Sequence, residues 1–156
     1  MKIDKVSLER AKTIHPILRD ELSDILTDCQ TAVGSSYSVR FSHVLRTNEE
    51  QDYLYSLGRT RGGNIVTKAK GGDSYHNYGL AVDVVLLIDK DKNGTFESVD
   101  WSYKQPFDKV VEIFKAKGWE WGGDWKFKDM PHFQKRMNYN IESLKKLPKE
   151  GLYPCL

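Results

Sequence analysis

The chain has 156 residues, of which 39% are hydrophobic and 29% charged, and its formal net charge is +2. This length suits a single domain, residues 1–156, with a real hydrophobic core. So small a net charge argues against a nucleic-acid-binding protein and is compatible with an acidic polymer as partner. The sequence shows no apolar run of membrane-spanning length and no signal-peptide pattern, so we expect synthesis in the cytoplasm without stable membrane association.

The N-terminal part of the sequence predicts two helices that pack on the core. Ser7 to Ile14 suits a short helix with Ser7 as N-cap, and Pro16 suits the first turn of a second helix. Cys29 and Cys155 fit no zinc or redox spacing, so we expect free thiols, with a bridge to the C-terminal tail as the alternative. The second helix has an apolar face at helical spacing: Leu18, Leu22, Ile25, Leu26 and Cys29.

A half-buried strand follows these helices. Residues from Tyr37 to Val44 alternate between apolar and polar side chains, which is typical of a strand with one face on the core. His43 lies near the end of this strand. We interpret His43 as a polar strand-end residue and not as a metal ligand.

Thr47 and Glu50 have the spacing of a capping box and predict a helix that ends at Gly58. Arg46 stands just before the cap, at a strand-to-helix corner that can hold a functional side chain rigidly. The alternative is that Arg46 makes an ordinary surface ion pair. Residues 59–72 are basic and rich in glycine, and they predict a loop or flap without the spacing of a P-loop.

The strongest strand signal is the apolar run of residues 80–88, Leu-Ala-Val-Asp-Val-Val-Leu-Leu-Ile. The carboxylate of Asp83 interrupts this run. Burial of an ionised carboxylate without a partner is very costly, so Asp83 must meet a cation, meet strong donors or face solvent. Because His76 lies only seven residues upstream, a metal ion is the simplest explanation.

Residues 89–100, D-K-D-K-N-G-T-F-E-S-V-D, admit two interpretations. The spacing matches a calcium loop, although the last position is normally Glu and the flanks here are strand-like. The alternative, which we favour, is a β-hairpin with a type I′ turn at Asn93-Gly94, and a hairpin tip that binds calcium weakly would satisfy both. The candidate calcium ligands are Asp89, Asp91, Asn93, Thr95, Glu97 and Asp100.

Pro106 to Lys117 predicts a helix with one apolar face, closed by Gly118. Three tryptophans then occur within seven residues. Trp119 and Trp121 alternate as on a strand, and we expect them in the core. Trp125 follows two glycines and is the candidate for one wall of a binding cleft.

The segment D-M-P-H-F-Q, residues 129–134, supplies a second candidate histidine ligand, His132. His76, Asp83 and His132 would form a three-ligand zinc site with a fourth position open to water. Asp129 would bring a carboxylate close to that water, as metal-assisted hydrolysis requires. The alternative is that both histidines are ordinary surface or hydrogen-bonded residues, because the spacing is not that of a helix-borne HExxH motif.

From Met137 onward the sequence predicts a short helix over residues 141–147 and an unstructured tail. The elements together predict an α+β fold. We expect a small antiparallel sheet that holds Asp83 and His132, with the N-terminal and Pro106 helices packed against it.

Ser74 to Asp83 fits the pattern S-x-H-x-x-G-x-A-x-D. Together with Trp121–Trp125 and Asp129–Phe133, it closely resembles the zinc D-Ala-D-Ala carboxypeptidase superfamily. The resemblance is nearest to the L-alanyl-D-glutamate peptidases of bacteriophage endolysins, and residues 45–51 and 54–60 also look like that branch. The superfamily also includes vancomycin-resistance dipeptidases and shares its architecture with hedgehog-type domains.

The resemblance implies roles for individual residues. It makes Asp129 the general base and Arg46 the group that binds the scissile carbonyl oxygen, although the dipeptidase branch has Glu where this chain has Asp129. Ser74 would hydrogen-bond the substrate or orient the His76 loop. Some phage relatives use calcium in the region of residues 89–100. The implied ligands of one catalytic zinc ion are His76, Asp83 and His132.

The function implied by the resemblance is zinc-dependent hydrolysis of an amide bond in the stem peptide of peptidoglycan. The nearest branch implies an L-alanyl-D-glutamate endopeptidase that acts in phage lysis. The absence of a signal-peptide pattern suits release through a membrane lesion, and we expect a monomer. The alternatives are a D-Ala-D-Ala carboxypeptidase, a cytoplasmic recycling peptidase and a non-catalytic zinc-containing binding module. The presence of both Asp129 and Arg46 favours catalysis over a binding module.

Overall fold

Helices and short antiparallel strands alternate along the chain, which a computed structural model describes over residues 1–156. This arrangement confirms the predicted α+β class. The elements are α1 (Lys5–Ala11), η1 (Pro16–Leu18), α2 (Arg19–Val33), β1 (Ser38–His43), α3 (Asn48–Ser56), η2 (Tyr75–Tyr78), β2 (Ala81–Ile88), β3 (Ser98–Asp100), α4 (Phe107–Ala116), β4 (Glu120–Trp121), η3 (Gly122–Asp124), β5 (His132–Gln134), α5 (Ile141–Lys145), β6 (Lys149–Glu150) and β7 (Tyr153–Pro154).

The strand β2 is the centre of the main sheet, whose order is β1-β2-β5-β4. One edge of β2 pairs with β1, whereas β5 and β3 share its other edge, and all these pairs are antiparallel. The register sets Asp83 opposite His43 on β1 and opposite His132 on β5. The predicted sheet that holds Asp83 and His132 is therefore confirmed.

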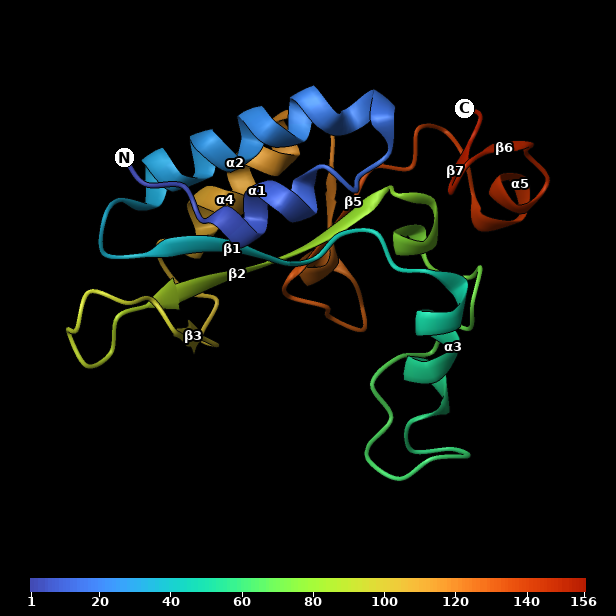
Figure 1. Cartoon of the computed structure of the whole chain (residues 1–156), viewed down its shortest axis with the longest axis horizontal. Coiled ribbons are helices and arrows are strands. Elements are labelled where there is room, and N and C mark those ends of the chain that lie inside the picture. The colour runs from blue at the N-terminus through green and yellow to red at the C-terminus, as the bar shows by residue number, and fades with distance from the viewer.

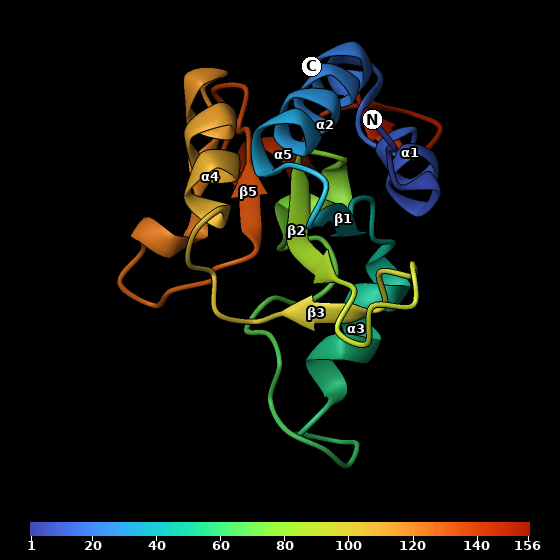
Figure 2. The ribbon, with the colours of Figure 1, turned by 90° about the vertical axis from the view of Figure 1, so that its left-hand side faces the viewer.

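Helices α1, α2 and α4 lie on one side of this sheet, whereas α3 and the loop after it project from the other side (Figures 1 and 2). Alternate side chains of β2, at Val82, Val84 and Leu86, belong to the core under the helices. The predicted apolar faces of α2 and α4 are buried in the same core. Asp83 has the opposite parity on β2, so its side chain lies on the face without these helices.

The first helix is capped differently from the prediction. Asp4, and not Ser7, is the N-cap of α1, because its carboxylate accepts hydrogen bonds from the backbone N–H and the hydroxyl of Ser7. The same carboxylate forms an ion pair with Arg40 of β1, at 2.7 Å from Nε. Ser7 is buried and bonds to β1, accepting from the backbone N–H of Phe41 at 2.8 Å. Asp4 therefore joins α1 to the sheet.

Thr47 caps α3 as predicted, by accepting a hydrogen bond from the backbone N–H of Glu50. The reciprocal half of the capping box is absent, because the Glu50 carboxylate accepts from the Thr47 hydroxyl at 3.0 Å. Cys29 is a buried free thiol and Cys155 an exposed one, as expected. None of the helices combines the length and the apolar character needed to cross a lipid bilayer.

The C-terminal tail is not unstructured as predicted. After α5, the strands β6 and β7 form a hairpin. The Tyr153 hydroxyl donates to the carbonyl of Thr13 at 2.8 Å, and a ring nitrogen of His15 lies 2.7 Å from the carbonyl of Pro154. These contacts with the N-terminal segment, which no local pattern reveals, order the tail and give His15 a structural role.

The loop between β2 and β3 is only partly as predicted. Ile88 pairs with Ser98, so a hairpin exists, but it is not closed by a type I′ turn. Such a turn needs positive φ at both central residues, and here Lys92 and Gly94 have positive φ, whereas Asn93 does not. The Asp89 carboxylate accepts hydrogen bonds from the backbone of Asn93 and Gly94, which produces a wider loop.

We expect Asp4→Ala to lower the free energy of unfolding by about 2 kcal/mol at pH 7, because it removes a cap and an ion pair. Burial alone would raise the pKa of Asp4, but its bonds to Arg40 and Ser7 outweigh burial and lower that pKa. The ionised carboxylate therefore stabilises the fold above its ordinary pKa of about 3.9, and this contribution is lost as the pH falls through the lowered value.

Urea unfolding at pH 7 and at successively lower pH would measure this effect. The difference between the wild type and Asp4→Ala should shrink as Asp4 is protonated. Asp4→Asn keeps a capping side chain without the charge and should lie between the two. A difference that does not change with pH would contradict the ion-pair contribution.

Candidate metal centre and cleft

The sheet register and one tight turn bring three candidate ligands together. Asp83 and His132 are directly opposite each other on neighbouring strands, so their side chains emerge on the same face of the sheet. His76 lies on η2, the turn just before β2. Gly79 ends this turn with a φ of +69°, and a Cβ there would lie 2.7 Å from the backbone nitrogen of His15. Only glycine fits this position, which directs His76 back toward Asp83.

Ser74 fixes the start of the same turn. Its hydroxyl accepts a hydrogen bond from the backbone N–H of His76 at 3.2 Å, and the Asn77 side chain completes a capping box. Asn77 also donates to the carbonyl of Arg46 at 3.0 Å. The turn that carries His76 is therefore tied to the start of α3.

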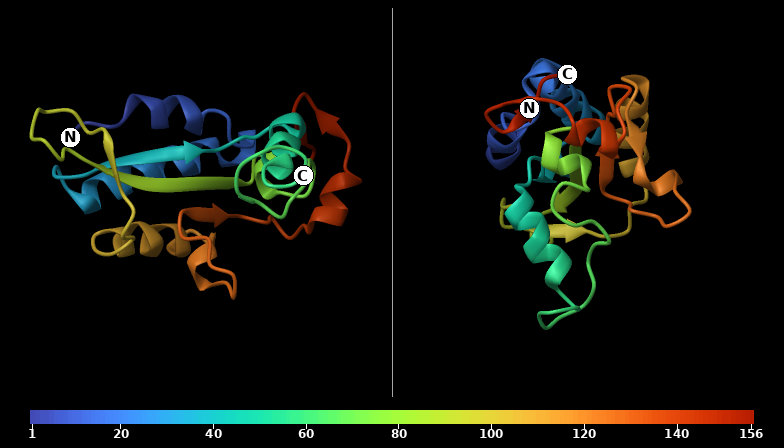
Figure 3. Two further views of the ribbon diagram at one scale, coloured as in Figure 1. Left: turned by 90° about the horizontal axis from the view of Figure 1, so that it is seen from below. Right: turned by 90° about the vertical axis from the view of Figure 1, so that its right-hand side faces the viewer.

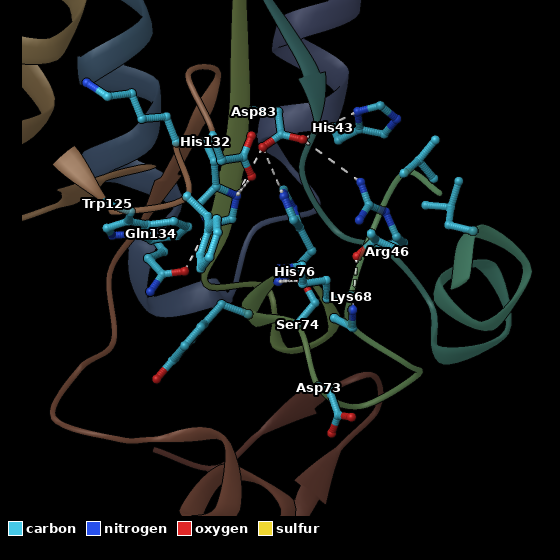
Figure 4. Close-up of a pocket in the computed structure, with 18 of the residues that line it drawn as sticks. His43, Arg46, Lys68, Asp73, Ser74, His76, Asp83, Trp125, His132 and Gln134 are labelled. Atoms are coloured by element: carbon cyan, nitrogen blue, oxygen red, sulfur yellow. Dashed lines mark hydrogen bonds and ion pairs between the residues drawn. The ribbon is translucent and has the colours of Figure 1, made fainter. Parts of the chain in front are cut away.

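The two histidines converge on one oxygen of the Asp83 carboxylate. Asp83 Oδ1 lies 3.1 Å from His76 Nε2 and 3.1 Å from His132 Nδ1 (Figure 4). These residues form the one group of three or more His, Cys, Asp or Glu side chains whose ligand atoms lie within 4.8 Å of one another. Two histidines and a carboxylate are the type of ligand set that zinc and similar metal ions bind in proteins.

Each histidine has an inner ring nitrogen, which faces Asp83, and an outer one, which points away from it. The hydrogen bonds of the outer nitrogens show that this group suits a cation. His76 Nδ1 lies 2.7 Å from the backbone carbonyl of Val44, which can only accept, so Nδ1 carries a proton. His132 Nε2 lies 2.8 Å from the side-chain oxygen of Gln134, and donates to it in the same way. In neutral imidazoles the two inner nitrogens then direct lone pairs at a carboxylate oxygen. Three acceptors so close together require a cation between them.

The protonation of the group follows the same logic. Burial would raise the pKa of Asp83, but the charges of and hydrogen bonds to His76 and His132 outweigh burial and hold it well below its ordinary value. Burial would lower the pKa of His132, but the Asp83 carboxylate outweighs burial and raises it. A proton and a metal ion therefore compete for the same position.

Asp129 and Arg46 lie on either side of this group. Asp129 Oδ2 is 3.9 Å from His132 Nδ1, and 52% of the Asp129 side chain is exposed. Burial and the nearby Asp83 charge raise the pKa of Asp129. Arg46 is mostly buried, and its guanidinium lies 3.9 Å from the second oxygen of Asp83. An acid and a permanent cation thus flank the candidate metal position.

Gly122 determines where Asp129 lies. The backbone N–H of Asp129 donates to the carbonyl of Gly122 at 2.9 Å. A Cβ on residue 122 would collide with the carbonyl oxygen of Asp129. The glycine of the Trp-Gly-Gly-Asp-Trp segment is therefore needed for close approach of the two chain segments.

The candidate metal ligands His76, Asp83 and His132 form the floor of an open cleft of about 710 Å³. One wall comes from residues 65–69 of the loop after α3, and the opposite wall comes from Trp125, Phe127 and Lys128. The Trp125 ring is tilted against His132, with 5.2 Å between the ring centroids. Arg46 and Ser74 also line the cleft, so every residue with a predicted role in catalysis, zinc binding or substrate binding lies in one place.

Three polar residues of the site had no predicted role. Gln134 holds His132, and Gln51, which is fully buried, accepts from Arg46 Nη1 at 3.0 Å. His43 is half-exposed with Nδ1 at 3.7 Å from Asp83, and it lies outside the converging group. Gln51 could have been suspected from its buried position on the predicted helix, but Gln134 becomes informative only once the strand pairs are known.

The predicted calcium loop lies away from this site and gives calcium no support. Its carboxylates do not form a converging group. The Asp91 side chain accepts from the backbone N–H and the side-chain amide of Asn93, and Glu97 also accepts from that amide. Internal hydrogen bonds therefore occupy the side chains that were candidate ligands: Asp89, Asp91, Asn93 and Glu97.

Three ligand atoms at the floor of an open cleft, beside an acid and an arginine, are typical of metal-dependent hydrolases. The sequence model of a family described as D-alanyl-D-alanine carboxypeptidase matches residues 67–135. This chain is also 42% identical over 130 residues to the peptidoglycan L-alanyl-D-glutamate endopeptidase CwlK of Bacillus subtilis (strain 168). That alignment covers 78% of this chain and 72% of the relative. The chain therefore belongs to the D-alanyl-D-alanine carboxypeptidase family and is a peptidase.

The hydrogen bond from His132 to Gln134 leads to a prediction about metal affinity. We expect Gln134→Leu to weaken metal binding about 10- to 100-fold, because it removes the acceptor that orients the His132 ring. Competition with a chromogenic chelator would measure the affinity, and circular dichroism would check the fold. Asp129→Ala, which alters a residue outside the three ligands, should bind metal like the wild type. Equal affinities for Gln134→Leu and the wild type would refute the orienting role.

Proposed function

We propose that this chain is a zinc-dependent peptidase that cleaves the bond between L-alanine and D-glutamate in the stem peptides of peptidoglycan. The observation that carries the proposal is the convergence of two histidine nitrogens and the Asp83 carboxylate on the floor of an open cleft. The similarity to the Bacillus subtilis endopeptidase supports this choice of bond. Nitrogen and carboxylate ligands with an open fourth position favour zinc.

In this proposal, the zinc ligands are His76, Asp83 and His132. The bound ion would supply a water of lowered pKa and would polarise the scissile carbonyl. The protein holds the ligands ready for it, because the carbonyl of Val44 and the amide of Gln134 fix both ring orientations. Little reorganisation is then needed when the ion binds.

Asp129 is the proposed general base. It accepts a proton from the water that attacks the amide carbon and returns that proton to the leaving amine. Its half-exposed side chain can reach the cleft, and its raised pKa brings it closer to neutral pH, where proton transfer in both directions is efficient. Gly122 holds the backbone of Asp129 at this place.

Arg46 is the proposed donor to the oxyanion that forms on the scissile carbonyl. A guanidinium stays charged in a cleft and does not need to move during the reaction. Gln51 holds one of its terminal nitrogens at 3.0 Å, and the backbone N–H of Arg46 donates to the carbonyl of His76. The arginine is therefore tied to the turn that carries a zinc ligand.

Two further residues have proposed roles in substrate binding. Ser74 lines the cleft, but its hydroxyl already accepts from the backbone of His76, which favours the orienting role over direct contact with substrate. Trp125 offers a flat apolar wall beside His132, suited to the methyl groups of alanine residues. A role in phage lysis of a host cell is the remaining part of the proposal and rests on the motif resemblance alone.

A D-Ala-D-Ala carboxypeptidase is the second candidate, because the matching family model carries that description. Digestion of purified peptidoglycan, with and without a zinc chelator, followed by mass spectrometry distinguishes the candidates. Chelator-sensitive fragments with a new D-glutamate amino terminus would support the endopeptidase. Release of terminal D-alanine alone would replace it by the carboxypeptidase. No cleavage by the zinc-loaded protein would favour a binding module.

We expect Asp129→Asn to lower kcat about 10²- to 10⁴-fold while the zinc content stays at the wild-type level, because only proton transfer is lost. Turnover of a soluble stem peptide and metal analysis of the same sample would measure both. Asp124→Asn is a matched control in the same segment, where the carboxylate pairs with Lys115 and not with the site. It should keep full activity. Wild-type turnover by Asp129→Asn would exclude Asp129 as the base.

For Arg46→Lys we expect kcat to fall about 10²- to 10³-fold, with zinc retained. Lysine keeps the positive charge but lacks the planar group that contacts Gln51 and faces the cleft at the same time. Steady-state kinetics on the soluble peptide would separate kcat from KM. A variant that changed KM alone would mean that Arg46 binds the ground state and not the oxyanion.

A further inference from the structure

Six cationic side chains lie in the two chain segments that form the walls of the cleft, and two of them, Lys68 and Lys128, line it. They come from the loop after α3 and from the segment that carries Trp125. Neither residues 53–72 nor residues 125–128 contain a single Asp or Glu. We call this set the basic collar; its members, all exposed, are Arg59, Arg61, Lys68, Lys70, Lys126 and Lys128.

The collar cations have no acidic partner in the protein. No carboxylate lies within 4.0 Å of any of their charged nitrogens, although the rest of the chain forms many ion pairs. Five of the six lie over aromatic rings instead. Arg59 is 3.8 Å and Lys70 is 5.4 Å from the Tyr55 ring centroid, and Arg61 is 5.1 Å from that of Tyr53. The rings hold these charges without neutralising them.

The ring of Phe127 brings the two parts of the collar together. Lys68 and Lys126 lie 4.2 and 5.9 Å from the ring of Phe127, so that ring joins the two walls. The α3 helix and its loop project from the body at one end of the molecule, far from the loop between β2 and β3 (Figures 1 and 3). Phe127 is 72% exposed and Tyr53 is 53% exposed, which adds apolar surface between the charges.

The collar concentrates positive charge in two short segments of the chain. Its six positive charges exceed the net charge of the whole chain, +2, so the remaining residues are net negative. Cations gathered in this way attract an anionic polymer to this part of the surface. Positive side chains that no internal carboxylate neutralises are available for an external anion.

We propose that the basic collar binds carboxylates of the stem peptides next to the one in the cleft, and so holds the peptidoglycan strand during cleavage. This inference rests on the proposed function, because peptidoglycan is the anionic polymer that the cleft would have to admit. Stem peptides repeat along each glycan strand and carry free carboxylates. The partner is therefore a repeating, widely spaced anion with apolar alanine methyl groups and sugar faces between its charges.

The exposed rings among the cations favour peptidoglycan over a phosphate polymer. Tyr55 and Phe127 each carry two of the cations, and the glycine-rich loop of residues 59–72 lacks the spacing of a P-loop. The exposed rings of Phe127 and Tyr53 suit the sugar and alanine surfaces between the charges. Substrate contacts would thus extend well beyond the scissile bond.

The test uses the triple variant R61Q/K70Q/K126Q, which neutralises three collar residues that do not line the cleft. Its matched control, K90Q/K92Q/K104Q, removes the same charge from exposed lysines of the segment around β3. Binding to insoluble peptidoglycan, first stripped of phosphate polymers, is measured by pelleting in the Asp129→Ala background, so that the substrate stays intact. Turnover of peptidoglycan is compared with turnover of a short soluble stem peptide that fills only the cleft.

We expect the collar variant to bind stripped peptidoglycan about tenfold more weakly than the control variant, since exposed ion pairs each contribute little. Its ratio of polymer to short-peptide turnover should fall by a similar factor, and its binding should depend less on salt. Equal losses in both variants would reduce the effect to net charge and overturn the proposal. Wild-type binding that disappears on stripping would assign the collar to a phosphate polymer.

These outcomes are distinct from failure of the proposed function. A wild-type protein that does not cleave the short peptide would refute the peptidase assignment, whereas the pelleting comparison would still report on the collar. Conversely, efficient cleavage of the short peptide combined with equal polymer binding by both triple variants would refute the collar alone.

Discussion

The carboxylate of Asp83 is the constraint on which the site depends. It lies in the middle of an otherwise apolar central strand, where only 16% of its side chain is exposed. Burial of such a charge requires compensation. The two neighbouring histidines supply it, one from the opposite strand and one from the turn before β2. A register shift of one residue would send Asp83 into the core under the helices, so the metal group and the core specify the same pairing.

Further hydrogen bonds hold in place the side chains that surround the Asp83 carboxylate. Each histidine needs an acceptor on its outer nitrogen if its inner nitrogen is to present a lone pair. The backbone carbonyl of Val44, just after β1, provides one acceptor, and the side chain of Gln134 on β5 provides the other. Gln51 of α3 holds Arg46 in a similar way, because its side-chain oxygen accepts a hydrogen bond from the guanidinium. Its side-chain NH₂ also donates to the carbonyl of Ala69 at 2.9 Å. One buried glutamine thus connects the arginine with a wall of the cleft.

The sequence predicts the parts of this design that depend on local pattern. The apolar run around Asp83 indicates a central strand, and helical spacing indicates the faces of α2 and α4, because in both cases burial dominates the local energetics. A metal site at Asp83 can be proposed because an isolated carboxylate in such a strand needs a cation, and the neighbouring histidine motifs supply His76 and His132 as candidate ligands. The resemblance of the motifs to a peptidase family adds Asp129 and Arg46, whose roles no spacing alone implies.

The predictions that were wrong concern polar side chains whose partners lie outside the local sequence pattern. Asp4 and Ser7 both suit an N-cap, and the ion pair of Asp4 with Arg40 decides between them. The tail is ordered by Thr13 and His15, more than a hundred residues earlier in the chain. Asn93-Gly94 is a strong local turn signal, but the Asp89 carboxylate accepts from that backbone and imposes a wider loop. In each case a polar side chain finds a partner that no sequence window contains.

The net charge of the sequence says little about function, whereas the positions of the charges in the structure say more. A formal net charge of +2 excludes little beyond strongly ionic partners. The fold places six cations without acidic partners in the two walls of one cleft, separate from other cations of the chain that are neutralised in ion pairs, such as Lys135 with Glu21. A peptidase that acts on an insoluble anionic network gains from this separation. In the proposed role, the collar would bring the catalytic cleft to the polymer.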